Sequence, residues 1–483
     1  MKIALIYPNY GNRRPPSFPV GLGYVASTLI NAGHEVVPVL MDVERDLTSE
    51  SLAARVSDEG FEVVGISALV TRYRFIKELT RTLKRRCPDV PIVVGGKIAD
   101  SVPERLLEKT PIDVICLGEG EFLAVDLLNA LAGDRMMSSV KGIWYRDGSS
   151  IVRNPPRSPI ADLDSIPFPA YHLFPMETYQ KALPEWVKNL VPGARRTAFM
   201  QTNRGCPFSC TFCRREFEPR AVRFRSIPNI LEELELLRDR YSIDSVIFND
   251  ELTLVSKQRA LALADGMRSS GFGLTWHCLA RVDCIDREIV HALKSAGCTS
   301  IGFGIESGSQ QILDEMNKRV TVEQSRAALE VCRQERMEVN CTYMVGMPSE
   351  TPATIRQTVD FMRDTRALGN LFFATAYPGT TLWEQVTTAG RIPDVETYLD
   401  RLNDAVDYVT NFTAMEDQEF LNVHQKATKE IEEIRIELEA IKQLRRAPTR
   451  LINSVRSRGL KATFALALRR GAEVIGKRVG LGH

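Results

Sequence analysis

Apolar runs rich in Val and Ile alternate with amphipathic stretches over the first 130 residues of the chain. The runs that predict strands are residues 2–8, 34–42, 61–69, 91–96 and 113–121. The stretches with helical spacing of apolar positions are residues 19–33, 70–87, 102–110 and 121–131. Strands that alternate with helices indicate a parallel sheet with helices on both faces, so this part of the chain predicts a doubly wound α/β domain.

The same alternation returns in the second half of the chain. Its predicted strands are residues 197–203, 244–250, 274–280, 299–305, 338–346 and 370–378. Six strand–helix units, where a closed barrel has eight, predict a partial (β/α)6 barrel of the TIM type. In such barrels the functional loops follow the carboxyl ends of the strands, so candidate chemistry is expected there.

The remaining stretches differ from both of these regions. Residues 131–196 are rich in proline and are predicted to be irregular. Residues after 385 have the charged, Glu–Lys and Glu–Arg spaced pattern of exposed helices. The sequence therefore predicts a first domain over residues 1–135, a linker over 136–196, a barrel over 197–385 and a mainly helical region over 386–483.

Composition agrees with a multidomain globular protein. The chain has 483 residues, of which 44% are hydrophobic and 25% charged, and this length exceeds what one hydrophobic core usually accommodates. No apolar run approaches the ~18 residues of a membrane-spanning helix, and the N-terminus reads as a strand rather than a signal peptide. These features favour a cytoplasmic protein.

The net charge of +1 hides a basic C-terminal segment. From Lys442 to the end there are eleven Lys or Arg and one acidic residue, Glu473, so this segment carries +10 and the remainder −9. A solvated helix or tail explains this pattern, and so does peripheral contact with an anionic membrane that presents a lipid-like substrate. No nucleic-acid-binding motif accompanies the charge, so nucleic acid is not expected as a partner.

Three cysteines in C-x3-C-x2-C spacing follow the first predicted strand of the barrel: Cys206, Cys210 and Cys213. Thiolates at this spacing can hold three irons of a [4Fe–4S] cluster and leave the fourth iron open to another ligand. The alternatives are a purely structural cluster or a zinc site, for which the next donors are His277 and Cys278. The other thiols are read as ordinary buried cysteines: Cys87, Cys116, Cys284, Cys298, Cys332 and Cys341.

The segment RGCPFSCTFC, residues 204–213, resembles the cluster motif of the radical S-adenosylmethionine superfamily. The resemblance implies that the methionine end of S-adenosylmethionine chelates the open iron. It also implies that one electron, from a donor such as flavodoxin or ferredoxin, releases a 5′-deoxyadenosyl radical that abstracts hydrogen from an unactivated carbon. The protein would supply position and exclude water, while the cofactor supplies the reactive species.

Polar residues at the other predicted strand ends match this family. The resemblance places Asp250 or Glu251 at the methionine amino group, and the absence of a Gly-Gly-Glu motif leaves the choice between them open. Glu306 and Ser307 match the region that contacts the ribose and the carboxylate.

Four further candidates complete this set. Gly346 and Met347 match the strand-end motif near the adenine, and Phe212 would pack against the adenine. Arg281 follows the third strand, and its guanidinium could bind a carboxylate.

The order of motifs along residues 1–385 resembles the cobalamin-binding radical S-adenosylmethionine enzymes. In a Rossmann-like domain, cofactors bind beyond the carboxyl ends of the strands, where glycines allow close approach. The candidate cobalamin residues are Gly21, Ser67, Gly95, Gly96, Gly118, Glu119 and Gly120. The chain lacks D-x-H-x-x-G, so cobalamin is expected without a histidine lower ligand and with its dimethylbenzimidazole tail against Ser67, Gly95 and Gly96.

Two cofactor sites suggest methylation of an unactivated carbon on a small-molecule or lipid-like substrate. An alternative is a radical rearrangement or oxidative ring closure of a tetrapyrrole-like or natural-product substrate, as in the anaerobic magnesium-protoporphyrin monomethyl ester cyclases, which the chain also resembles. A third hypothesis, from another class, is a redox-sensing iron–sulfur protein that catalyses nothing. Release of 5′-deoxyadenosine and transfer of a labelled methyl group separate the three.

Overall fold

The structure is a computed structural model that describes residues 1–9, 16–181, 183–214, 221–403 and 405–446. Its first sheet has seven strands in the order β2-β1-β3-β4-β5-β6-β7. The strands are β1 (Lys2–Tyr7), β2 (Glu35–Leu40), β3 (Val63–Ser67), β4 (Ile92–Gly95), β5 (Val114–Cys116), β6 (Ile143–Asp147) and β7 (Ser150–Arg153). Pairing is parallel up to β5 and antiparallel for β6 and β7.

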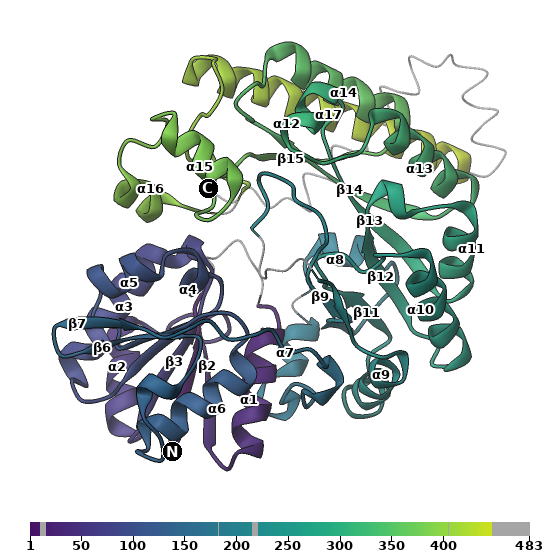
Figure 1. Cartoon of the computed structure of the whole chain (residues 1–483). Helices are drawn as coiled ribbons and strands as arrows, with labels where there is room; N and C mark the ends of the chain where they lie inside the picture. Colours follow the sequence, from purple (N-terminus) through teal and green to yellow (C-terminus); the bar gives the residue numbers. More distant parts are fainter. Residues whose placement is uncertain (10–15, 182, 215–220, 404, 447–483) are drawn as a thin grey trace, which may run out of the picture.

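Helices cover both faces of this sheet (Figure 1). One face is covered by α1 (Val20–Asn31) and α6 (Gly120–Leu131). The other is covered by α2 (Ser49–Asp58), α3 (Tyr73–Arg86), α4 (Lys97–Ser101) and α5 (Pro103–Lys109). Because successive strand residues face opposite sides, Ile3 and Leu5 of β1 join one core while Ala4 and Ile6 join the other. The predicted doubly wound domain is confirmed.

Three parts of this domain were not expected from the sequence: helix α2, the short helix α4 and the strand pair β6–β7. Helix α2 presents only Leu52, Ala53 and Val56 to the core, so its apolar periodicity is weak. The start of the helix is fixed by the Thr48 capping box. Strands β6 and β7 lie inside the segment predicted to be irregular, and they extend the sheet beyond β5. That prediction is wrong at these residues, while the division into domains stays a prediction.

The second sheet has six parallel strands in the order β15-β14-β13-β12-β11-β8. The strands are β8 (Thr197–Met200), β11 (Ser245–Phe248), β12 (Thr275–Ala280), β13 (Cys298–Glu306), β14 (Glu338–Val345) and β15 (Gly369–Phe373). Its outer helices are α9 (Ile227–Tyr241), α10 (Lys257–Ser269), α11 (Arg287–Ser295), α12 (Gln310–Glu315), α13 (Val322–Gln334) and α14 (Pro352–Thr365). The predicted partial (β/α)6 barrel is confirmed.

Short elements connect the two sheets. Strands β9 (Asn203–Arg204) and β10 (Arg223–Phe224) form an antiparallel pair beside the cysteines. Helix α7 (Met176–Lys181) precedes α8 (Glu185–Leu190), which packs on the inner face of the barrel against Ile247. The single-turn 3-10 helices are η1 (Val70–Arg72), η2 (Met137–Ser139), η3 (Leu163–Ser165), η4 (Tyr171–Leu173) and η5 (Val282–Cys284).

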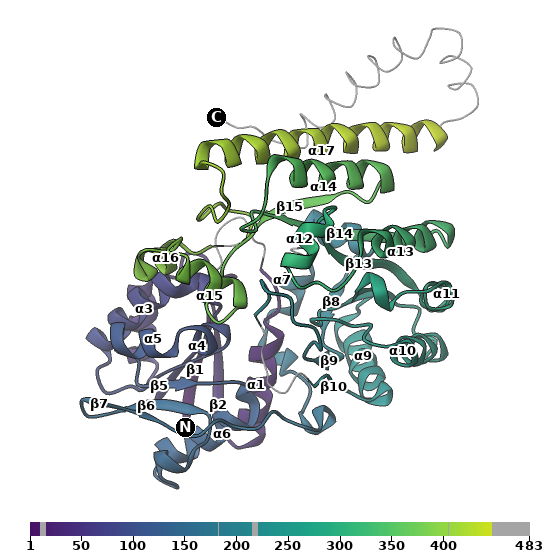
Figure 2. The ribbon, with the colours of Figure 1, turned by 45° about the horizontal axis from the view of Figure 1, so that its top comes forward.

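The region after the barrel is mainly helical, as predicted, with α15 (Thr381–Thr388), α16 (Val395–Arg401) and α17 (Asp417–Arg446). Helix α17 lies along α14 (Figure 2), and Glu430 of α17 pairs with Arg356 of α14 at 2.6 Å. Helix α16 contacts the first domain through Glu396 and Asp400, each 2.6 Å from Nζ of Lys77. The region after the barrel therefore contacts both the first domain and the barrel. The basic segment beyond residue 446 lies outside the described residues.

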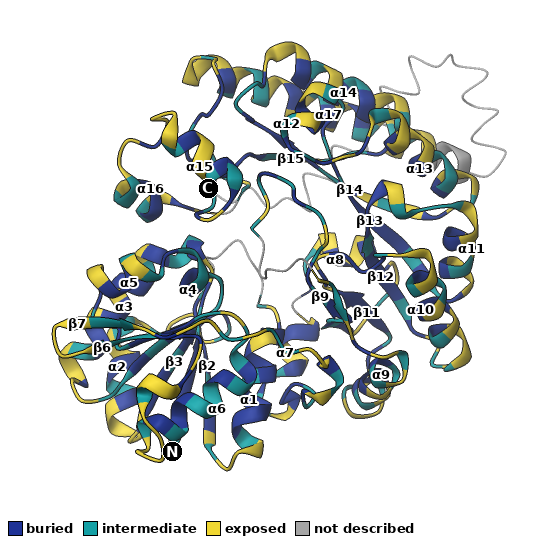
Figure 3. Cartoon of the chain, in the orientation of Figure 1, coloured by how far each residue is buried: buried dark blue, intermediate teal, exposed yellow. Residues whose placement is uncertain are grey.

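The buried side chains follow the two sheets and the inner sides of their helices (Figure 3). Among the described residues, none of the helices is apolar over a length that would span a membrane.

Candidate active site

The carboxyl ends of both sheets line one pocket of about 490 Å³. The first domain contributes the ends of β3, β4 and β5, and the barrel contributes residues that follow β8 and β11. All the candidate cobalamin residues line it: Gly21, Ser67, Gly95, Gly96, Gly118, Glu119 and Gly120. Asp250 and Glu251, predicted for S-adenosylmethionine, line it as well. The structure therefore brings together residues predicted for two different cofactors.

Glycines shape the wall of this pocket. At Gly21 and Gly118 a Cβ atom would meet no other atom within 4 Å, so the missing side chains leave open space there. Gly96 has φ +75°, and a Cβ would lie 2.9 Å from Oγ of Ser67. Only glycine fits this crowded left-handed position, which turns the chain from β4 into α4.

The inner part of the pocket is apolar. It lies between the sheet and helices α1 and α6, and its walls include Ile3, Leu5, Val63, Leu127 and Leu128. No histidine is among the described lining residues. An apolar slot entered between glycine turns fits the flat aromatic tail of cobalamin and offers no imidazole to its metal.

His34, which lies between α1 and β2, is not among the residues that line this pocket. Its Nδ1 is 3.4 Å from the N-terminal amine.

Glu119 contacts protein at both of its carboxylate oxygens. Arg204 donates to it at 2.7 Å, Arg223 at 2.8 Å and the backbone N–H of Ile160 at 2.6 Å. Burial raises the pKa of Glu119, but the bonds from Arg223 and Arg204 outweigh it and leave the pKa below its usual value. The carboxylate thus joins the first domain to the barrel, and Glu121 pairs with Arg204 in the same way at 2.5 Å.

The three cysteines of the predicted cluster lie on one loop after β8. The backbone N–H of Cys213 donates to the carbonyl of Cys210 at 3.2 Å, which folds the loop back on itself. Burial, together with the charges of Cys210, Glu251 and Cys206, raises the pKa of Cys213 to about 12. Burial also raises the pKa of Cys206. Thiols that disfavour one another's charge need a bound cation to become thiolates, so this loop fits an iron–sulfur cluster.

Among the described residues, no group of three His, Cys, Asp or Glu side chains is arranged to hold one metal ion, and this holds for the three cysteines of the loop as well as for the donors of the zinc alternative. His277 is buried, its Nδ1 is 2.7 Å from Oγ of Ser300, and burial lowers its pKa to about 4. Cys278 is buried against Cys298. Cys284, grouped with the buried thiols from the sequence, is only half-buried and interacts electrostatically with Cys206.

Residues that sequence reasoning missed hold the cysteine loop from the barrel side. Asn317 donates to the carbonyl of Ser209 at 2.8 Å, and the carbonyl of Met316 accepts from the N–H of Thr211 at 2.9 Å. The N–H of Leu382 donates to the carbonyl of Thr211 at 2.8 Å. Nothing in their spacing relates these residues to the cysteines, because the contacts join segments more than 100 residues apart.

The two candidates for the methionine amino group differ in their surroundings. Asp250 is 4% exposed, and its carboxylate accepts from the N–H and Oγ of Thr202 at 2.6 and 2.7 Å and from the N–H of Asn203. Glu251 is exposed, and its charge acts on Lys97 and on Cys213. Asp250 therefore orders the turn after β8, while Glu251 lies open to a ligand beside the cysteines.

Three other candidates make contacts within the barrel. Glu306 pairs with Lys318 at 2.9 Å, a residue not predicted from the sequence. Ser307 is buried, and its Oγ lies 3.1 Å from Oγ1 of Thr358 on α14. The guanidinium of Arg281 stacks 3.6 Å over the ring of Phe208 in the cysteine loop and donates two bonds to the carboxylate of Asp283.

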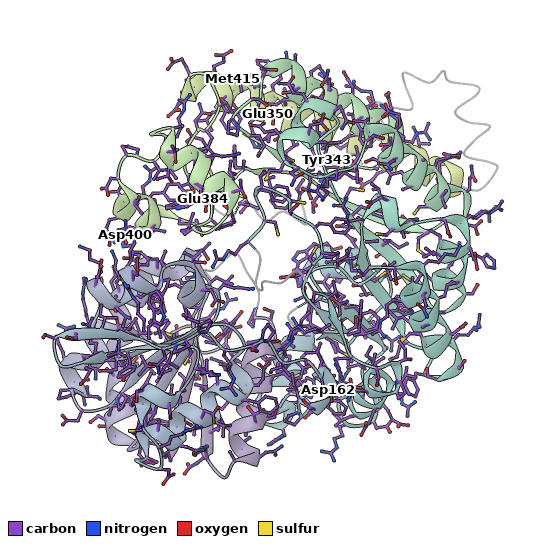
Figure 4. All side chains as sticks on the ribbon, viewed as in Figure 1. Asp162, Tyr343, Glu350, Glu384, Asp400 and Met415 are labelled. Carbon is purple, nitrogen blue, oxygen red and sulfur yellow. The ribbon has the colours of Figure 1, made fainter. Side chains whose placement is uncertain are left out.

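The remaining candidates lie after β14 and in the cysteine loop. Gly346 has φ +102°, and its N–H donates to Glu350 at 3.3 Å; Glu350 is labelled in Figure 4. Met347 is fully buried, and Phe212 packs against the same hydrophobic cluster. The roles carried over from the family resemblance stay predictions for all of these residues.

Comparison with known proteins gives two family matches. Residues 200–362 match the Radical SAM superfamily, and residues 10–128 match the B12 binding domain. The first match covers the cysteine loop and most of the barrel. The second covers the first domain as far as α6.

Three similar proteins each match more than three quarters of this chain. An uncharacterized methyltransferase of Pyrococcus horikoshii is 30% identical over 369 residues, which are 76% of this chain and 78% of the relative. The anaerobic magnesium-protoporphyrin IX monomethyl ester cyclase of Rubrivivax gelatinosus is 26% identical over 82% of this chain and 72% of the relative. The radical S-adenosylmethionine methyltransferase TsrM of Kitasatospora setae, solved with tryptophan and an S-adenosylmethionine analogue, superposes with a TM-score of 0.66. That match has 20% identity and covers 81% of this chain and 77% of TsrM. The chain therefore belongs to the cobalamin-binding radical S-adenosylmethionine enzymes, whose cofactors are a [4Fe–4S] cluster, S-adenosylmethionine and cobalamin.

Proposed function

We propose that this enzyme methylates an unactivated carbon of a small-molecule or lipid-like substrate. The observation that carries the proposal is the single pocket lined by the carboxyl ends of both sheets. A methyl donor in the first domain and a hydrogen-abstracting centre in the barrel would then face one substrate. The similarity to a methyltransferase over three quarters of the chain supports this choice.

We propose that Cys206, Cys210 and Cys213 hold the cluster and that the glycine-lined pocket of the first domain holds cobalamin. When bound, S-adenosylmethionine and the cluster supply a substrate radical by hydrogen abstraction, and cobalamin supplies the methyl group. The reaction would require two electrons per turnover from a donor such as flavodoxin or ferredoxin, one for hydrogen abstraction and one for renewal of the methyl donor by a second S-adenosylmethionine.

The chain's own residues position these groups against each other. Nη2 of Arg214, directly after Cys213, donates to the carbonyl of Asp100 at 2.5 Å, which ties the cysteine loop to the first domain. Lys97 of the first domain interacts electrostatically with Cys213 and Glu251 of the barrel. Arg204, two residues before Cys206, is held by Glu119 and Glu121. These contacts join the cysteine loop to the first domain, so that groups bound on the two sides would keep one separation.

The test is anaerobic reconstitution with iron, sulfide and cobalamin, followed by incubation with S-adenosylmethionine that carries an isotope-labelled methyl group. The probes are L-tryptophan, magnesium-protoporphyrin monomethyl ester and a small-molecule cell extract. A product that carries the labelled methyl group, together with 5′-deoxyadenosine, supports methylation. Deoxyadenosine with an unlabelled, modified product would instead support rearrangement or ring closure. The cyclase similarity motivates that second candidate. Absence of deoxyadenosine with every probe would favour a redox sensor.

A second proposal concerns the basic C-terminal segment and stands on its charge alone. Its net charge of +10 fits an anionic membrane surface that presents a lipid-like substrate to a cytoplasmic enzyme. Removal of residues 448–483, which carry +7 of this charge, should then reduce association with vesicles that contain anionic lipid. Unchanged partitioning would remove the membrane contact from the proposal.

A further inference from the structure

A buried ion pair lies beside the cysteine loop. Nζ of Lys318, which follows α12, is 2.9 Å from the carboxylate of Glu306 at the end of β13. Lys318 is 7% exposed, so its charge is largely removed from water. A buried ion pair carries a desolvation cost, and it persists where the surrounding structure holds it in place.

The barrel leaves a specific space for this pair. A Cβ atom at Gly304 would overlap the carboxylate of Glu306 and lie 3.1 Å from Nζ of Lys318. Glu306 has φ +67°, and the pairing of β13 with β14 shifts register between Gly304 and Glu306. Both features cost energy: a non-glycine residue with a left-handed backbone, and an irregular strand pairing. They persist only where the surrounding structure holds the backbone in this conformation.

The backbone around Lys318 is fixed to the cysteine loop. Asn317 bonds to the carbonyl and Oγ of Ser209 at 2.8 and 3.0 Å, and the carbonyl of Lys318 accepts from Arg281 at 2.8 Å. The residues on either side of Lys318 both have left-handed backbone conformations, Asn317 at φ +49° and Arg319 at φ +56°. Lys318 is therefore held beside the loop that carries the cysteines.

Lys318 lies within electrostatic range of two cysteines of the loop, Cys210 and Cys213. Glu306 supports the charge of Lys318, and Arg281 acts against it. The ion pair is thus a fixed pair of charges beside the cysteine loop.

We propose that Lys318 is a positioning residue that stabilises the reduced state of the cluster held by Cys206, Cys210 and Cys213. The inference rests on the proposed cluster site. Reduction adds one electron from an external one-electron reductant, so the cluster and its thiolates gain one negative charge. A fixed cation close to the ligands makes that state more favourable, and buried polar groups around a cluster are a principal determinant of its potential.

The test is a reductive titration of the reconstituted protein with dithionite, monitored by electron paramagnetic resonance without S-adenosylmethionine. Lys318→Met should lower the ratio of reduced to oxidised cluster about tenfold at a fixed potential, which corresponds to about 59 mV for a one-electron couple. Glu306→Gln should shift the ratio in the opposite direction, because it removes the anion behind the cation. Lys318→Arg keeps the charge and should remain close to the wild type. Lys294→Met is the matched control, since Lys294 is an exposed lysine near the amino ends of the same barrel's strands.

Iron content separates this inference from the proposed function. A wild-type protein that binds no iron would refute the cluster site itself. If the wild type holds the cluster, equal shifts in Lys318→Met and Lys294→Met, or shifts of the same sign in Lys318→Met and Glu306→Gln, would overturn the role of Lys318. Lys318→Met could also fail to assemble the cluster. In that case, a raised ratio of reduced to oxidised cluster in Glu306→Gln, together with an unchanged ratio in Lys318→Arg, supports the inference. An unchanged ratio in Glu306→Gln refutes it.

Discussion

The pocket of the first domain and the cysteine loop of the barrel differ in what shapes them. The pocket is open where Gly21 and Gly118 carry no side chain, over an apolar inner wall. The loop is shaped by side chains that come from distant segments, such as Asn317 and Arg281. A site made by glycines at strand ends leaves its mark in the local sequence. For a site supported by hydrogen bonds from distant segments, the local sequence identifies the ligands but not the residues that hold them in place.

The largest effect is expected at the cysteine loop itself. Cys210→Ala leaves two thiolates for three irons, so the reconstituted protein should lose its iron and its release of 5′-deoxyadenosine. Iron per chain and visible absorbance measure the loss. Cys87→Ala, at a buried thiol of the first domain, is the control and should keep both. A full complement of iron in Cys210→Ala would contradict the cluster assignment.

The next effect concerns the contact between the two regions. Arg204→Met leaves Glu119 and Glu121 buried without this cation, and breaking a buried ion pair costs about 3–5 kcal/mol. The free energy of the first urea-unfolding transition should fall by this amount. Arg74→Met removes an exposed pair with Glu78 and should cost about 1 kcal/mol or less. Equal costs for the two variants would show that Arg204 does not hold the domains together.

A third prediction concerns pH and the barrel rim alone. Burial raises the pKa of Glu350 from 4.5 to about 7. The folded protein keeps a proton there that the unfolded chain releases above pH 4.5, so the stabilisation is complete below pH 4.5 and is lost as pH rises through 7. Glu350→Gln mimics the protonated form and removes that loss.

Between pH 5 and pH 8, Glu350→Gln should therefore gain about 2–3 kcal/mol of stability relative to the wild type. Urea unfolding at the two pH values measures it. Glu384→Gln, at an exposed position on α15, controls for the substitution. A constant difference between Glu350→Gln and the wild type would show that this carboxyl titrates normally in the fold.

The smallest effect is expected in the pocket of the first domain. Leu at position 21 would fill space that the glycine leaves open, so Gly21→Leu should weaken cobalamin binding about tenfold, or about 1.4 kcal/mol. Visible titration with cobalamin measures the affinity. Gly21→Ala should have a smaller effect, and both substitutions suit a helix better than glycine, so folding should be preserved. Undiminished affinity in Gly21→Leu would place cobalamin elsewhere.

The sequence supports prediction of the two α/β units because their strands and helices have strong apolar periodicity. It also locates the cysteine loop, which follows a predicted strand, and most glycines of the pocket, which lie at the ends of predicted strands; Gly21 lies in α1 instead. Helix α2 was missed since it buries only three apolar side chains. Lys318 and Asn317 were missed because their contacts with the cysteine loop and with Glu306 depend on tertiary structure. The engagement of Glu119 by Arg204 and Arg223 was likewise invisible, since nothing in the sequence pairs residues about 100 positions apart.

The antiparallel pair β6–β7 has a practical consequence for dissecting the protein. Strand β5 pairs with β6 over Val114–Cys116, so β5 is an interior strand only while the hairpin is attached. A fragment that stops at residue 135 would expose the backbone of β5 as a free edge, and free edges recruit strands from other molecules. Such a fragment should therefore aggregate. A fragment that extends past Arg153 keeps β6 and β7, so the backbone amides of β5 stay paired and the fragment should not aggregate.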